Sequence, residues 1–232
     1  MTPSDLSACK SALIGEILVF SLLGKALYEE LDKTWLDTLI REDMFAEIPF
    51  GAEQTEIQRG LELLRHWTKE NREGVSEREF KTIKRDQLYL FIGTDQVLAP
   101  VWESVYFSEE HLVFQEQTLQ VRQWYSRFGL QAERINREPD DHIGLELSFV
   151  SHLAKQALQA VDQNDEQNYE ELLQAQRDFL SEHLLRWAPV WAKLVKQNAE
   201  TDFYRGLAHL THGALLEAAD LLEIKLPREV KS

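Results

Sequence analysis

The side chains with the clearest chemical potential are gathered in residues 138–142, which read Glu-Pro-Asp-Asp-His. An Asp that follows Pro139 is typical of the residue that caps a helix start. Capping needs one carboxylate, and this segment offers three, together with a histidine. Carboxylates bind guanidinium groups through charge-assisted hydrogen bonds. The segment therefore predicts either a capped, solvated helix start or an acidic corner that binds a basic peptide, formed by Glu138, Asp140, Asp141 and His142.

A second unusual segment is 86–106, where large apolar residues run through a connection that contains Pro100. We expect irregular backbone between Thr94 and Glu103, because the residue before a proline avoids helical geometry. Trp102 and Tyr106 lie in this connection rather than on a helical apolar stripe. Rigid amphipathic aromatics in such a place predict a groove for an apolar peptide or, alternatively, a plug between helices.

The elements that must position these segments are helices. Apolar residues recur at helical spacing along nearly the whole chain, and no strand-like alternation of useful length occurs. Ser76 and Glu79 form a capping-box pattern, and Gly93 and Gly129 are typical helix ends. We also expect Pro189 to break a helix. The pattern predicts an all-α bundle with helices over about 4–27, 33–40, 57–64, 76–92, 115–128, 140–161, 169–187 and 203–221.

The polar stretch 131–139 is the best candidate for a hinge. We therefore expect one domain, 1–232, built from two helical halves, about 1–130 and 140–226, which this linker joins. Such a chain is a monomer or, if the halves exchange between two chains, a domain-swapped dimer.

Charge and cysteine content exclude several classes of protein. The 232 residues include 25 Lys and Arg against 40 Asp and Glu, a formal net charge of −15, which repels nucleic acid and attracts basic partners. The one cysteine, Cys9, excludes an intramolecular disulfide and fits a reducing compartment. The apolar stretch 12–23 contains Glu16 and is shorter than a membrane span, and no signal peptide is recognisable. We expect a cytoplasmic protein without stable membrane insertion.

Most enzyme chemistry lacks its sequence pattern here. No phosphate-binding glycine loop occurs, and no histidine has a Glu three residues before it, as a helical di-iron site needs. Cys9 has no recognisable partner and is interpreted as a buried or incidental thiol. We expect no catalytic residue and no bound metal. The alternative is a helical metal-binding enzyme or carrier that uses His142 with Glu146 and the pair His209 and His212.

The two unusual segments together resemble a known family. The stretches Leu90-Phe-Ile-Gly93, Ala99-Pro-Val-Trp-Glu-Ser-Val-Tyr106 and Glu138-Pro-Asp-Asp-His-Ile-Gly144 look like signatures of the TorD/DmsD family of cytoplasmic maturation chaperones for molybdenum enzymes. The stretch 118–124 is similar to the DmsD branch, and 179–187 and 203–204 also fit. The matches extend from about Asp86 to Tyr204, while the first eighty residues match only in helical character.

The resemblance implies a function without catalytic turnover. Such proteins bind the twin-arginine signal peptide of a reductase of the dimethyl sulfoxide or trimethylamine N-oxide type, and hold its apo-form in the cytoplasm during cofactor insertion, before export. It implies no cofactor for the chaperone itself, although guanine nucleotide binding has been attributed to some relatives. The peptide site of the family maps onto Leu90, Phe91, Pro100, Trp102, Tyr106, Asp141 and His142. Val101, Gln87 and Thr94 depart from the family pattern.

Overall fold

The computed structural model describes residues 3–93, 97–108, 110, 112–131 and 138–226. Helices make up the regular structure of these residues, and the expected all-α class is confirmed. In chain order they are α1 (Pro3–Tyr28), α2 (Lys33–Arg41), α3 (Thr55–Glu70), α4 (Glu77–Gln87), the π-helix η1 (Leu88–Ile92), α5 (Glu103–Phe107), α6 (Glu116–Arg127), α7 (Ile143–Asp162), α8 (Glu166–Glu182), α9 (Leu184–Asn198) and α10 (Asp202–Leu221).

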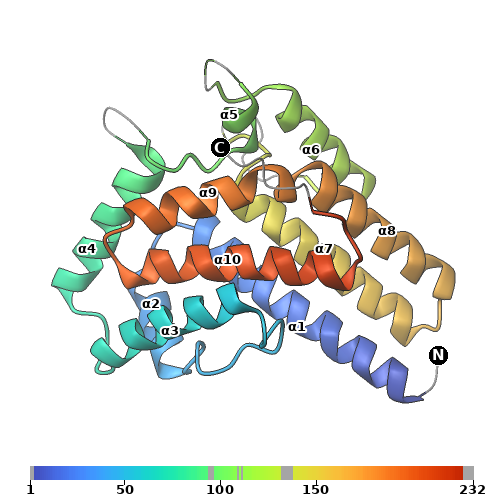
Figure 1. Cartoon of the computed structure of the whole chain (residues 1–232), viewed down its shortest axis with the longest axis horizontal. Coiled ribbons are helices and arrows are strands. Elements are labelled where there is room, and N and C mark those ends of the chain that lie inside the picture. The colour runs from blue at the N-terminus through green and yellow to red at the C-terminus, as the bar shows by residue number, and fades with distance from the viewer. Residues whose placement is uncertain (1–2, 94–96, 109, 111, 132–137, 227–232) are drawn as a thin grey trace.

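Two long helix pairs form the centre of the molecule. Helix α1 packs along α7, and α3 packs along α10, while α8 and α9 lie against these pairs (Figure 1). Each pair joins a helix that precedes residue 130 to one that follows residue 140. The two expected halves therefore share one interleaved core. The expected linker falls largely on residues 132–137, which lie outside the described residues.

Close approach of α1 and α7 depends on two facing glycines. A Cβ atom on Gly144 would lie 2.8 Å from the carbonyl oxygen of Gly24 and 2.8 Å from the backbone nitrogen of Tyr28, which is too close for a side chain. Because Gly144 is the second residue of α7, this contact fixes the start of that helix, where the acidic corner lies.

Some expected helix ends are confirmed and one is wrong. Ser76 caps α4 through a bond from the backbone N–H of Glu79, and Gly93 ends η1 with φ of 67°. Pro189, however, lies inside α9. The chain breaks instead at His183, whose ring nitrogen lies 2.7 Å from a carboxylate oxygen of Glu103. A proline removes a single helical hydrogen bond, which surrounding packing can offset, whereas this long-range contact sets the break.

A short helix replaces the end of the expected irregular connection. Helix α5 begins after Trp102, which has extended backbone, and it includes Tyr106. The placement of Tyr106 in a non-helical connection is therefore wrong. The reason is tertiary: the first turn of α5 is capped by a side chain from the acidic corner, described below.

Helix α1 is more apolar than its sequence pattern suggested. Among the described residues it is the one helix long and apolar enough to cross a membrane by length and composition, over Leu6–Tyr28, with a mean hydropathy of 1.7. The expectation that its apolar stretch is too short is therefore wrong on length. In the fold, Leu13, Phe20 and Leu23 belong to the buried core, and Glu16 is buried as well.

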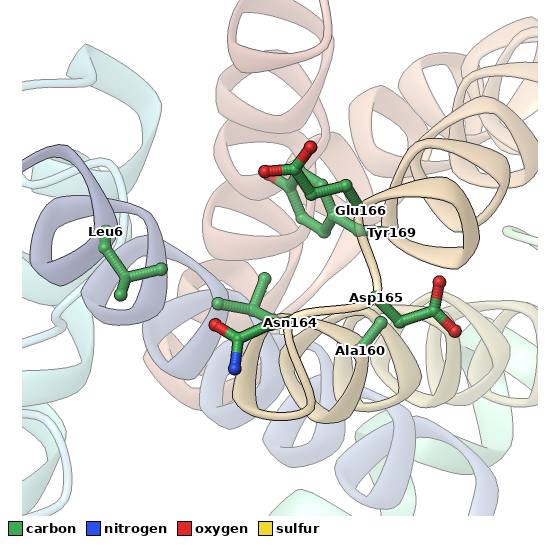
Figure 2. Close-up of a pocket in the computed structure, with 7 residues that line it drawn as sticks. Leu6, Ala160, Asn164, Asp165, Glu166 and Tyr169 are labelled. Atoms are coloured by element: carbon green, nitrogen blue, oxygen red, sulfur yellow. The ribbon is translucent and has the colours of Figure 1, made fainter. Parts of the chain in front are cut away.

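A small cavity of about 110 Å³ lies where α1 begins and where α7 turns into α8 (Figure 2). The thiol of Cys9 on α1 lies 3.2 Å from the hydroxyl of Tyr169, which lines this cavity. Cys9 is partly buried, in keeping with its interpretation as an incidental thiol. None of the predicted site residues lines the cavity, whose walls are Leu6, Ala160, Val161, Asn164, Asp165, Glu166 and Tyr169.

We predict that Gly144→Ala lowers the free energy of unfolding by about 1–3 kcal/mol, because the new methyl group forces α1 and α7 apart. Urea unfolding followed by circular dichroism measures the change. Lys155→Ala, an exposed change on the same helix, serves as the control and should have little effect. Equal stability of the two variants would contradict the close-packing role of Gly144.

Glu16 makes the stability of the protein depend on pH. Burial raises the pKa of Glu16 to about 8, from 4.5 in an exposed chain. Between these values the folded state holds a proton that the unfolded state releases, so stability falls as the pH rises. We expect Glu16→Gln to raise the melting temperature at pH 8 and to leave it near wild type at pH 4. A gain of the same size at both pH values would contradict the buried acid as its cause.

Candidate functional site

The two segments singled out in the sequence meet in the fold. A short antiparallel bridge joins Trp102 to His142. The backbone N–H of Glu103 donates to the carbonyl of Asp141 (2.9 Å), and that of Ile143 donates to the carbonyl of Val101 (2.8 Å). The acidic corner and the Pro100–Tyr106 segment are therefore neighbours, although the bridged residues are forty positions apart in the sequence.

Asp141 holds this junction together from inside. Its side chain is fully buried, and one oxygen accepts from the backbone N–H of Ser104 (2.7 Å). The other oxygen accepts from the hydroxyl of Thr118 on α6 (2.7 Å). Asp141 thus caps α5 and ties it to α6, and both of its oxygens already have partners.

His142 caps the next helix. Its ring Nδ1 accepts from the backbone N–H of Gly144 (3.1 Å) at the start of α7. The ring packs edge-on against Tyr28 and Trp102, with centroids 5.2 and 6.1 Å away. Burial lowers the pKa of His142 to about 3, so the ring is neutral at physiological pH. The sequence left the direction of this shift open, because burial is a tertiary property.

The other members of the acidic corner have defined partners too. Asp140 is buried and pairs with Arg122 of α6. Glu138 is half-buried and accepts from the indole N–H of Trp102 (2.8 Å). Trp102 is itself half-buried, so this pair forms the accessible part of the junction.

Pro100 and Tyr106, two more of the predicted site residues, are joined by a hydrogen bond within the Pro100–Tyr106 segment. The hydroxyl of Tyr106 donates to the carbonyl of Pro100 (2.7 Å), and both residues are half-buried. This bond holds the proline turn against α5. Tyr106 also packs on Trp187 of α9, with ring centroids 5.1 Å apart.

Leu90 and Phe91 are buried beneath the surface of η1. Phe91 stacks on Trp191 and meets Tyr204 edge-on, with centroids 6.2 and 5.3 Å away. The carbonyl of Leu90 accepts from the backbone N–H of Ala99. These two residues anchor η1 and Ala99 to the core. Other side chains form the outer face of η1.

That outer face carries residues that the sequence interpretation missed. Leu88, Tyr89 and Ile92 are exposed, Ile92 by 63%. Of thirteen exposed large apolar side chains among the described residues, seven lie between positions 88 and 119; the other four of these are Phe107, Leu112, Phe114 and Leu119. A sequence signal existed: the helical stripe through Phe80, Ile83 and Leu90 accounts for one buried face only, so the additional apolar residues of 88–92 had to face elsewhere.

Two further acids lie beneath the junction. Glu103 pairs with the ring of His183, and Glu146 accepts from the indole N–H of Trp187 (3.3 Å). All four residues are buried, and burial raises the pKa of both glutamates. These contacts fix α5 and α7 to α9.

The residues of the metal-binding alternative have other roles in the fold. The ring Nδ1 of His142 is engaged in the helix cap. His209 and His212 both approach Glu56 of α3, at 2.8 and 3.4 Å, and Lys196 lies 2.9 Å from the same carboxylate. Within the described residues, no group of three or more His, Cys, Asp or Glu side chains could hold a metal ion.

We predict that Asp141→Ala lowers the free energy of unfolding by about 3 kcal/mol, since it leaves the partners on Ser104 and Thr118 buried without an acceptor. Thermal unfolding of the variant beside Asp178→Ala, a more exposed acid on α8, measures the difference. Wild-type stability of Asp141→Ala would overturn the structural role of this carboxylate.

The chain is similar in sequence to known proteins. The sequence model of the family described as nitrate reductase delta subunit matches residues 52–193. A probable Tat proofreading chaperone DmsD from Haemophilus influenzae is 28% identical over 206 residues, which cover 89% of this chain and 91% of that protein.

Two TorD proteins are similar over a shorter stretch. Chaperone protein TorD of Vibrio cholerae is 34% identical over 121 residues, 52% of this chain and 53% of that protein. TorD of Photobacterium profundum is 32% identical over 134 residues, 57% of this chain and 61% of that protein. The chain thus matches these TorD proteins over about half to three fifths of their length. With the motifs of residues 86–144, these matches show that the chain belongs to the TorD/DmsD family, within the nitrate reductase delta subunit group, a family of chaperones and not of enzymes.

Proposed function

We propose that this chaperone binds the twin-arginine signal peptide of a molybdopterin-dependent reductase of the dimethyl sulfoxide or trimethylamine N-oxide type. It holds the apo-form of that subunit in the cytoplasm, assists its folding and cofactor insertion, and releases it for export. The observation that carries the proposal is the concentration of exposed apolar side chains along residues 88–119, a stretch whose Trp102 bridges to His142 of the acidic corner, in a member of this family.

The apolar part of the leader is received on the outer face of η1 and on Trp102. Leu88, Tyr89 and Ile92 already face solvent, so a peptide can cover them without opening the core. Pro100 and Tyr106 shape the neighbouring turn through their hydrogen bond. Leu90 and Phe91 support this surface from beneath instead of touching the peptide.

The basic part of the leader is attracted by charge. The net charge of −15 steers a cationic segment toward the protein, and salt weakens this attraction. Glu138 is the most accessible acid of the corner, whereas Asp141 and His142 contribute by holding the junction in shape. Each large apolar side chain that becomes buried contributes roughly 1.5–3 kcal/mol before ordering costs, so a micromolar Kd is reasonable.

Several properties of the partner complex belong to the same proposal. The chain acts as a single domain, 1–232, in the cytoplasm, as a monomer or as a domain-swapped dimer. Its partners are the leader and the apo-form of the client subunit. The shared core of the helices that flank residues 131–139 supports one domain rather than two.

We predict that Ile92→Ser weakens leader binding by about fivefold or more, because the peptide then buries less apolar surface. Isothermal titration with a synthetic twin-arginine leader measures the Kd, and a twin-lysine peptide tests the arginine requirement. Leu221→Ser, which changes a side chain 53% exposed on α10, is the matched control and should bind as wild type does. Equal effects of the two variants, or no binding of the leader to wild type, would overturn the proposal.

A further inference from the structure

The ion pair of Asp140 with Arg122 is the contact of the acidic corner in which an acid binds a charged group. Asp141 and Glu138 accept from neutral donors. Asp140 is only 1% exposed, yet its Oδ2 accepts from both Nε (2.9 Å) and Nη2 (2.6 Å) of Arg122. The side chain of Arg122 is 29% exposed. A buried carboxylate is therefore neutralised by a guanidinium group that reaches it from the surface.

The pair lies in the wall of an open cavity of about 430 Å³ between the end of α6 and the start of the 138–142 segment. Asp140 and Arg122 both line this cavity, together with Tyr125, Ser126, Gly129, Leu130 and Gln131. The hydroxyl of Tyr125 donates to the backbone carbonyl of Asp140 (3.1 Å), which fixes the backbone from which the carboxylate extends. Both members of the ion pair therefore border open space at the surface.

The remaining acids of the corner hold partners of another type. Both oxygens of Asp141 accept from Ser104 and Thr118, and Glu138 accepts from the indole of Trp102. Among these three acids, Asp140 is the one bound to a guanidinium group. That group is also the chemical feature that distinguishes the proposed ligand.

We propose that Asp140 is the floor of a guanidinium-binding site, that Arg122 occupies this site in the free protein, and that an arginine of the bound leader displaces it. This inference rests on the proposed function. It adds where an arginine of the leader binds and which side chain of the protein competes with it for that position. Exchange of one guanidinium for another keeps the buried carboxylate paired at every stage, which avoids the large cost of an unpaired buried charge. Because Arg122 is tethered beside the site, it acts as a resident competitor and weakens the apparent affinity for the leader.

The first test compares leader binding to Arg122→Ala and to Arg85→Ala by isothermal titration. Both changes remove one positive charge, and Arg85 pairs with the surface acid Glu200 (2.6 Å), so general electrostatic effects cancel. We expect Arg122→Ala to bind the twin-arginine leader about tenfold more tightly than Arg85→Ala does. The gain should disappear in the double variant Arg122→Ala with Asp140→Asn. Equal or weaker binding by Arg122→Ala overturns the inference.

The second test needs no peptide. Loss of Arg122 leaves the Asp140 carboxylate unpaired, so the melting temperature should fall, and millimolar ethylguanidinium should restore part of it. Ethylammonium should restore less, since it lacks the two-pronged donor geometry. The double variant with Asp140→Asn keeps the fold without a buried unpaired charge and should show no rescue.

The two tests separate the inference from the proposed function. Should ethylguanidinium rescue Arg122→Ala while the leader binds no variant and not the wild type, the guanidinium site stands and the signal-peptide function fails. Should the leader bind the wild type but neither rescue nor tighter binding follow the loss of Arg122, the function stands and the displacement mechanism fails.

Discussion

The organisation of the candidate site depends on a short backbone bridge between residues 102 and 142. Two hydrogen bonds, together with the buried Asp141 side chain, hold an aromatic turn against the start of a long helix. Side-chain capping stabilises two helix ends at one point, because a carboxylate oxygen of Asp141 and the ring Nδ1 of His142 accept from backbone N–H groups that no helix can satisfy itself. Beneath them, Glu103 and Glu146 anchor the same helices to α9. The junction is rigid for this reason.

Buried and exposed residues of the junction have different roles. The residues with the most distinctive sequence pattern, such as Asp141 and Phe91, lie inside and determine shape. Less distinctive neighbours, such as Tyr89 and Ile92, lie outside and offer apolar surface. A peptide-binding chaperone needs both, since a preorganised surface loses less conformational entropy when a ligand binds.

The negative charge of the protein also acts in two ways, at long range through the net charge and at short range through one carboxylate. The high net negative charge acts at long range and requires no particular residue. Recognition of arginine at short range requires a carboxylate in a fixed position. The carboxylate of Asp140 is paired with Arg122, and Tyr125 holds the backbone carbonyl of the same residue. In the proposed mechanism, long-range attraction and local exchange of guanidinium groups are therefore separate properties, which different variants can perturb independently.

Local sequence patterns are enough to predict the helical class, most helix ends and the two segments that form the candidate site, because helical periodicity, capping residues and glycine stops act over a few residues. They did not determine the break at His183 or the helix that begins after Trp102, since each depends on a contact with a residue distant in the sequence. Nor did they decide which acids of residues 138–142 face solvent. Burial is a property of the packed molecule, and it was the tertiary structure that turned Asp141 and His142 into helix caps and left Glu138 and Trp102 accessible.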